Sequence, residues 1–270
     1  MIGRNDRLSL PGGVALTASG LRDDVRGVEL PLNEAARVVV QSATPGAAAE
    51  ALCARFRIDE RRALVDTRSF CAELNHRMLL NLRTRSGAAT LAVRWAVTAA
   101  RQLPFGVRPS FPTRRRAVDT TSMFGTAASG ARALAPGTVA LGAWTAAATA
   151  LALSALGTRS LPLALTAGAA VAVGVFAHEL GHLLALRGAP ACLVTRGLRL
   201  WVLHRPLGRG REALVALAGP VAGTTPALLV LAVFLARGSP EAGIASLLLS
   251  LQLVGCTVLT RDGRRLCADW

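Results

Sequence analysis

The chain has 270 residues, of which 52% are hydrophobic and 17% are charged, and its formal net charge is +15. This composition excludes an intrinsically disordered chain and disfavours an ordinary soluble enzyme; it is typical of a membrane protein with a soluble part. The positive charge does not indicate nucleic-acid binding, because the basic residues are all arginines spread over the chain, without a basic stripe interleaved with aromatic residues.

The first 85 residues predict a small soluble α+β domain with a winged-helix-like order of elements. Short β-like segments separated by Gly and Asp come first, and three helical stretches follow. Each helix has a start signal: Asn33, the Thr-Pro-Gly turn at 44–46, and Asp59. The expected strands are 14–18 and 26–30, the expected helices are 33–42, 47–56 and 59–76, and 78–82 closes the unit.

Residues 86–137 are expected to connect this domain to a membrane domain. Arg94 and Arg101 lie seven residues apart on an otherwise apolar helix over 87–103, which suits a helix at the membrane surface; a plain connecting helix fits equally well. The proline-containing run from Pro104 to Pro136 is interpreted as a linker.

Residues 138–270 contain four apolar stretches, each close to the roughly 20 residues that a helix needs to cross a bilayer. The chain is therefore expected to be mostly α-helical, with a polytopic membrane bundle of about four spans behind the soluble domain. The spans are expected at Thr138–Leu156, Leu161–Leu186, Ala213–Ala236 and Ala242–Thr260.

The arginines around these spans predict the orientation of the bundle. Thirteen flank the ends that share a side with both chain termini, whereas two, Arg159 and Arg237, flank the other ends. Because positive charge accumulates on the cytoplasmic side, the soluble domain and the loop 187–212 are expected to face the cytoplasm, in a multi-pass protein of the bacterial inner membrane. Partial alternation over 193–204 is consistent with a short β-hairpin in that loop, and an irregular basic loop fits equally well.

One motif places ionisable side chains inside an expected span: His178-Glu179-Leu180-Gly181-His182. Helix positions i and i+4 share a face, so the two imidazoles can bind one metal ion, and Glu179 beside them can take a proton from a metal-bound water. Ionisable residues inside a membrane are costly and are functional by default. The motif therefore predicts a zinc hydrolase, with two histidines that merely bond to neighbouring helices as the structural alternative.

A catalytic zinc needs a third protein ligand and an open position for water. Four carboxylates follow the motif, and Asp262 is the best candidate because the expected topology places it at a depth similar to that of the histidines. Glu212 is interpreted as a helix-start acid, Glu241 belongs to the opposite membrane face, and Asp269 is the penultimate residue. His204 is the competitor for the third position.

Three elements of the membrane part stand in the order and spacing of a known family. They are HELGHLLALRGAP at 178–190, the Gly-Pro element at 218–223, and Asp-Gly at 262–263. Together they cover about 161–266 and resemble the site-2 protease family of intramembrane zinc metalloproteases. The small residues of the Gly-Pro element also suit close helix packing.

This resemblance implies a zinc ion held by His178, His182 and Asp262, with Glu179 as the catalytic base. The approach to Asp262 departs from the family, because Gln252–Arg261 lacks the usual Asn and Pro and ends in Arg261. The departure bears on the local geometry of Asp262 more than on the metal site itself.

The first domain resembles the PqqD-like fold, the peptide-recognition element of ribosomal peptide maturation systems. The resemblance covers about 8–82 and rests on ELPLNEAA at 29–36, the turn at 44–46 and the helix that ends FCAELNH at 70–76. It implies that a leader peptide binds as an added strand at the edge near Val25–Leu30 and against the helix 59–76. The alternative is a generic winged helix that binds DNA or merely stabilises the fusion.

The combined hypothesis is an intramembrane zinc metalloendopeptidase that hydrolyses a membrane-associated or leader-bearing precursor peptide during ribosomal peptide maturation. The expected partners are the lipid bilayer and the precursor or leader peptide. Two alternatives remain: regulated intramembrane proteolysis of a membrane-tethered signalling protein, and a catalytically silent membrane scaffold that docks peptides.

Overall fold

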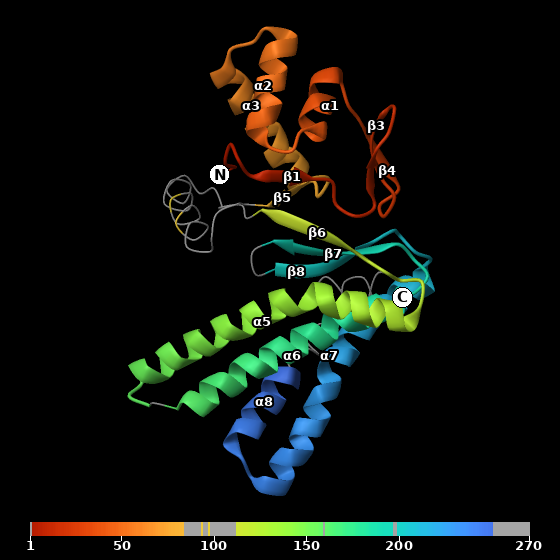
Figure 1. Ribbon diagram of the computed structural model, residues 1–270. Helices are drawn as coiled ribbons and strands as arrows, with labels where there is room; N and C mark the ends of the chain where they lie inside the picture. The colour runs from red at the N-terminus through yellow and green to blue at the C-terminus, as the bar shows by residue number, and fades with distance from the viewer. Residues whose placement is uncertain are drawn as a thin grey trace. The chain divides into compact units, whose positions relative to one another are not determined.

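A computed structural model describes residues 2–83, 93, 97, 112–158, 160–196 and 199–250. The described part is mostly helical with a small amount of β-sheet (Figure 1), which confirms the expected fold class at this level. The chain divides into two compact units, Met1–Ala117 together with Val194–Arg199, and Val118–Leu193 together with Leu200–Trp270. They are called unit 1 and unit 2 below.

The first strands of unit 1 are short and antiparallel. β1 (Arg7–Ser9) pairs with β5 (Asn81–Arg83), and β2 (Val14–Leu16), β3 (Gly20–Asp23) and β4 (Val28–Pro31) form a second sheet in that order. β2 falls within the strand expected at 14–18, β4 overlaps the strand expected at 26–30, and β3 lies between them. Because β3 is its one described neighbour, β4 forms an edge of this sheet.

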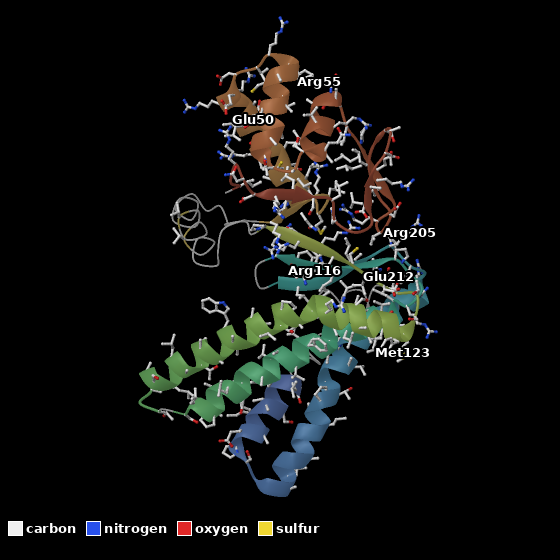
Figure 2. All side chains as sticks on the ribbon, viewed as in Figure 1. Glu50, Arg55, Arg116, Met123, Arg205 and Glu212 are labelled. Atoms are coloured by element: carbon white, nitrogen blue, oxygen red, sulfur yellow. The ribbon has the colours of Figure 1, made fainter. Side chains whose placement is uncertain are left out.

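Three helices follow, and each starts at the cap that the sequence indicates. α1 (Glu34–Gln41), α2 (Pro45–Phe56) and α3 (Glu60–His76) begin after Asn33, Thr44 and Asp59, whose side chains accept hydrogen bonds from backbone N–H groups of the first turn. Their apolar faces close a core with the strands, while charged side chains such as Glu50 and Arg55 of α2 remain exposed (Figure 2). The expectation of short strands followed by three helices is confirmed.

Unit 1 also contains β6 (Thr113–Val118), which the sequence interpretation had placed in a linker. The amide of Asn75 brackets Thr113, donating to its carbonyl at 2.7 Å and accepting from its N–H at 2.8 Å. The amide of Asn81 brackets Arg115 in the same way, with both bonds at 2.8 Å. These side-chain amides satisfy the β6 backbone as a neighbouring strand would.

β6 is fixed further by a fully buried ion pair. The guanidinium of Arg115 donates to both carboxylate oxygens of Asp23, at 2.6 and 2.7 Å, and both side chains are 0% exposed. Burial acts to raise the pKa of Asp23, but hydrogen bonds from Arg115 and Arg26 outweigh it and hold the pKa below its ordinary value. The ion pair therefore belongs to the core of unit 1.

The described part of unit 2 consists mainly of four helices: α5 (Met123–Ala155), α6 (Leu161–Ala185), α7 (Arg209–Arg237) and α8 (Pro240–Ser250). Within the described residues, α5 and α6 are long and apolar enough to cross a membrane. α5 begins at Met123 and contains Pro136, so the linker interpretation is also wrong from Met123 onward.

The third and fourth expected spans correspond to α7 and α8. α7 covers the third expected span in one helix, whereas α8 covers only the start of the fourth because 251–270 lies outside the described residues. The surface helix expected at 87–103 also lies outside them, apart from Val93 and Val97. A bundle of four spans stays a prediction.

The helices of unit 2 approach one another through small residues. A Cβ added to Gly168 of α6 would lie 2.5 Å from the carbonyl oxygen of Gly142 in α5, and one added to Gly181 would lie 2.5 Å from that of Ala218 in α7. Such contacts bring helix backbones together where there is little hydrophobic drive between helices. α6 is thus packed tightly against α5 on one side and α7 on another, and it also contacts α8 (Figure 1).

A strand pair follows α6. β7 (Ala191–Arg196) and β8 (Arg199–His204) are hydrogen-bonded neighbours separated along the chain by residues 197 and 198, and the sheet order is β6-β7-β8. Of the two interpretations of 193–204, the β-hairpin is confirmed. Leu193 of β7 packs in a cluster with Leu183 and Leu186 from the end of α6, and this contact anchors the start of the hairpin to α6.

Candidate metal centre

The two motif histidines face each other near the C-terminal end of α6. The Nε2 atoms of His178 and His182 are 3.1 Å apart, and the ring centroids are 4.8 Å apart in an edge-on arrangement. Positions i and i+4 bring the side chains to the same face, and the ring orientations turn both Nε2 atoms toward one point.

This geometry fits a shared metal ion. Two nitrogens bound to one tetrahedral zinc at about 2.0–2.1 Å lie roughly 3.3 Å apart. The 3.1 Å separation is close to that value. Two nitrogen lone pairs at this distance require a proton or a metal ion between them, since they would otherwise repel each other.

His182 is held from its other side by α7. Its Nδ1 lies 2.6 Å from the backbone carbonyl oxygen of Val215, and the residue is 7% exposed. A carbonyl oxygen can only accept, so Nδ1 carries a proton, and in the neutral form of the ring the Nε2 that faces His178 is then unprotonated. That tautomer is the one that a metal bound at Nε2 requires.

Glu179 is buried next to the pair. The residue is 9% exposed, on a helix whose other residues are apolar apart from Thr166 and the two histidines. A carboxylate oxygen accepts hydrogen bonds and protons. It can accept a proton from a water beside the histidines, which is the role that the sequence assigns to it.

The backbone of α7 lies directly against the side of α6 that carries His182. A Cβ added to Gly219 would collide with Nε2, Cε1 and Cδ2 of His182, so glycine is the one residue that leaves the imidazole in place. Sequence reasoning interpreted Gly219 as a packing residue and missed both this contact and the Val215 carbonyl. The Gly-Pro step in an apolar helix could have indicated the contact at Gly219. No sequence pattern indicates which backbone carbonyl accepts a hydrogen bond from a histidine.

The two candidates for a third ligand are Asp262 and His204. Asp262 lies outside the described residues, and within those residues no group of three or more His, Cys, Asp or Glu side chains is arranged to hold a metal ion. His204, the competitor, ends β8, where its Nδ1 lies 2.8 Å from the Arg205 carbonyl oxygen and 3.8 Å from a carboxylate oxygen of Glu212. Glu212 stands in the first turn of α7 as expected of a helix-start acid (Figure 2).

The expected peptide-binding edge falls on β4 and the turn before it. Val28 of β4 is 49% exposed, and Val65 of α3 is 54% exposed. Arg26 in the turn donates to the carbonyl of Arg77 at the end of α3, at 2.8 Å. Hydrogen bonds from Ser19 and Thr17 lower the pKa of the exposed Glu29 carboxyl, so this edge carries a negative charge near neutral pH.

Comparisons of the chain with protein-family models, with curated proteins and with solved structures find no match.

Proposed function

We propose that the chain is an intramembrane zinc metalloprotease whose N-terminal unit captures a precursor peptide. The observation that carries the proposal is the pair of Nε2 atoms of His178 and His182, 3.1 Å apart, beside the buried Glu179. Three ionisable side chains in one apolar helix are costly, and a shared ion with a neighbouring proton acceptor gives them a common use.

His178 and His182 would hold the zinc, with Asp262 as the proposed third ligand. When bound there, zinc supplies Lewis acidity, which lowers the pKa of a water it contacts and polarises a peptide carbonyl. Glu179 accepts the proton of the attacking water and can pass it to the leaving amine. In a bilayer the apolar residues of α5, α6 and α7 would keep bulk water away from the site, and a polar peptide is expected to enter from the end of α6 that carries the histidines.

Unit 1 is proposed to bind the leader of a precursor peptide, which would add as a strand to the open edge of β4. The exposed Val28 and Val65 offer apolar contacts on the two elements that the proposal assigns to the peptide, β4 and α3. The proposed site of action is the cytoplasmic face of the inner membrane, to which a ribosomally made precursor has direct access. Cleavage of a membrane-tethered signalling protein would use the same zinc site.

The deciding experiment compares the wild type with Glu179→Gln in the full chain. Glutamine preserves the shape of the side chain but cannot accept the proton, so proteolysis of a leader-bearing precursor should fall by about 10²–10⁴-fold. Zinc content should stay at that of the wild type, because Glu179 is not assigned as a ligand. Activity close to the wild type would place the base elsewhere, and a wild type that binds no zinc would end the proposal.

A further inference from the structure

We infer that α7 is the positioning element of the zinc site, because it fixes the tautomer and the ring position of His182. The inference rests on the proposed zinc site and deepens it. It assigns a role to Val215, through its carbonyl, and to Gly219, neither of which is a ligand.

The first observation is the hydrogen bond from His182 Nδ1 to the carbonyl of Val215, at 2.6 Å. Val215 is 3% exposed and His182 is 7% exposed, so water cannot substitute for this acceptor. Histidine ligands of metals commonly donate their other ring N–H to such a group, which fixes the tautomer and raises the basicity of the coordinating nitrogen. Here a helix backbone does so, and it is rigid in a way that a side chain is not.

The second observation is independent of the first. At Gly219 the backbone of α7 lies against the His182 ring, and an added Cβ would meet three of its atoms. Gly181, one residue before His182 in α6, is equally crowded, since its added Cβ would lie 2.5 Å from the Ala218 carbonyl oxygen. The two helices are therefore in register at this point, and one turn of α7 supplies both the acceptor and the wall that confines the ring.

The consequence is that zinc affinity depends on the packing of α7 and not on the HELGH helix alone. A small shift of α7 would move the Val215 acceptor and the Gly219 wall together, and the Nε2 atom of His182 would leave the point that it shares with His178. Loss of such a supporting group typically lowers metal affinity by about 10–100-fold.

The test uses full-length protein in detergent, with zinc affinity measured by competition against a chelator. Gly219→Ala should weaken zinc binding by about 10–100-fold. Gly168→Ala is the matched control, because its Cβ would lie 2.5 Å from the Gly142 carbonyl oxygen in an equally tight helix contact without histidines. The control should bind zinc like the wild type. Equal affinities for Gly219→Ala and the wild type would overturn the inference and leave the zinc proposal standing.

A second measurement observes the His182 ring in the wild type itself. The chain has four histidines, so ¹⁵N-histidine spectra of the wild type can be assigned with single His→Gln variants. His182 should be protonated at Nδ1 with or without zinc and should coordinate through Nε2. Coordination through Nδ1, or an Nε2–H tautomer without zinc, would overturn the inference. A wild type without zinc affinity but with the Nδ1–H tautomer would instead refute the proposed function.

Discussion

Arg115 and Asp23 form the most thoroughly buried ion pair described in the chain, and two further residues, Asn75 and Asn81, hold the strand that carries Arg115. A buried ion pair offsets its own desolvation cost only while both partners are present. Removing one partner leaves an uncompensated charge in the core. The stability of unit 1 therefore depends on a residue that lies 92 positions away from Asp23.

Asp23→Asn should destabilise unit 1 by about 3–5 kcal/mol, because it leaves the Arg115 guanidinium buried without its counter-ion. Hydrogen exchange of the α2 and α3 amides in the full chain reports this free energy. Asp24→Asn is the matched control: Asp24 pairs with Arg22 at the exposed surface, where such a pair contributes at most ~1 kcal/mol. Similar protection in both variants would show that the buried pair does not stabilise the unit.

The same pair predicts a pH dependence. The pKa of Asp23 is lower in the folded unit than its ordinary value of 3.8, so the stabilisation is fully present above pH 3.8 and is lost as the pH falls through the folded pKa. The difference in unfolding free energy between the wild type and Asp23→Asn should narrow as the pH falls below 3.8. A difference that stays constant across this range would mean that another group carries the stabilisation.

The third ligand of the proposed zinc site can be assigned by comparing two variants. Asp262→Ala should lose zinc and proteolysis, because a site of two histidines lacks the third protein ligand of catalytic zinc centres. His204→Ala should retain both, since His204 lies next to Arg205 and Glu212 at the end of β8. Metal analysis of the purified variants distinguishes the two, and the reverse outcome would assign the third position to His204.

At the scale of elements, the sequence predicted what capping and apolar periodicity encode. Asn33, Thr44 and Asp59 marked the starts of α1 to α3, and the apolar run before His178 predicted α6. β6 was missed because its run of arginines has no apolar alternation, and its backbone is held by amides distant in the sequence. The start of α5 was missed because Pro136 was interpreted as a boundary, although this proline lies inside the helix. Of the candidate site, the i, i+4 pair was predictable, whereas the contribution of α7 depends on packing between helices.

The edge strand β4 gives the prediction for peptide binding. Successive residues of a strand point their N–H groups to opposite sides, so one of Val28 and Glu29 presents its N–H to the open edge. Val28→Pro and Glu29→Pro each remove one backbone N–H group. The variant that removes the N–H at the open edge should weaken binding of a fluorescent leader peptide to the full chain. Val28→Thr and Glu29→Gln keep the N–H and serve as controls. Unchanged binding in both proline variants would exclude strand addition at β4.

At the scale of the whole molecule, the arginine distribution predicts that the loop after α5 and the loop before α7 face opposite sides of the membrane. Single cysteines at Thr158 and Arg205 of a cysteine-free variant should therefore differ in labelling by an impermeant thiol reagent. In right-side-out vesicles the cysteine at position 158 should react and the one at 205 should not. Labelling of both from one side would refute the proposed topology.

Unit 1 is built from two separate segments of the chain. This affects how its gene can recombine and how the protein can be divided into fragments. The unit takes Met1–Ala117 but also Val194–Arg199 from the tip of the hairpin that follows the histidine helix, so the chain crosses from one unit to the other three times. A fragment that ends at residue 85 would keep Asp23 without Arg115, and Asn75 and Asn81 without the strand they bracket. Unit 1 is thus not a module that can be exchanged on its own. Recombination between genes at a single junction would leave both units incomplete, so we expect the two units to be inherited together.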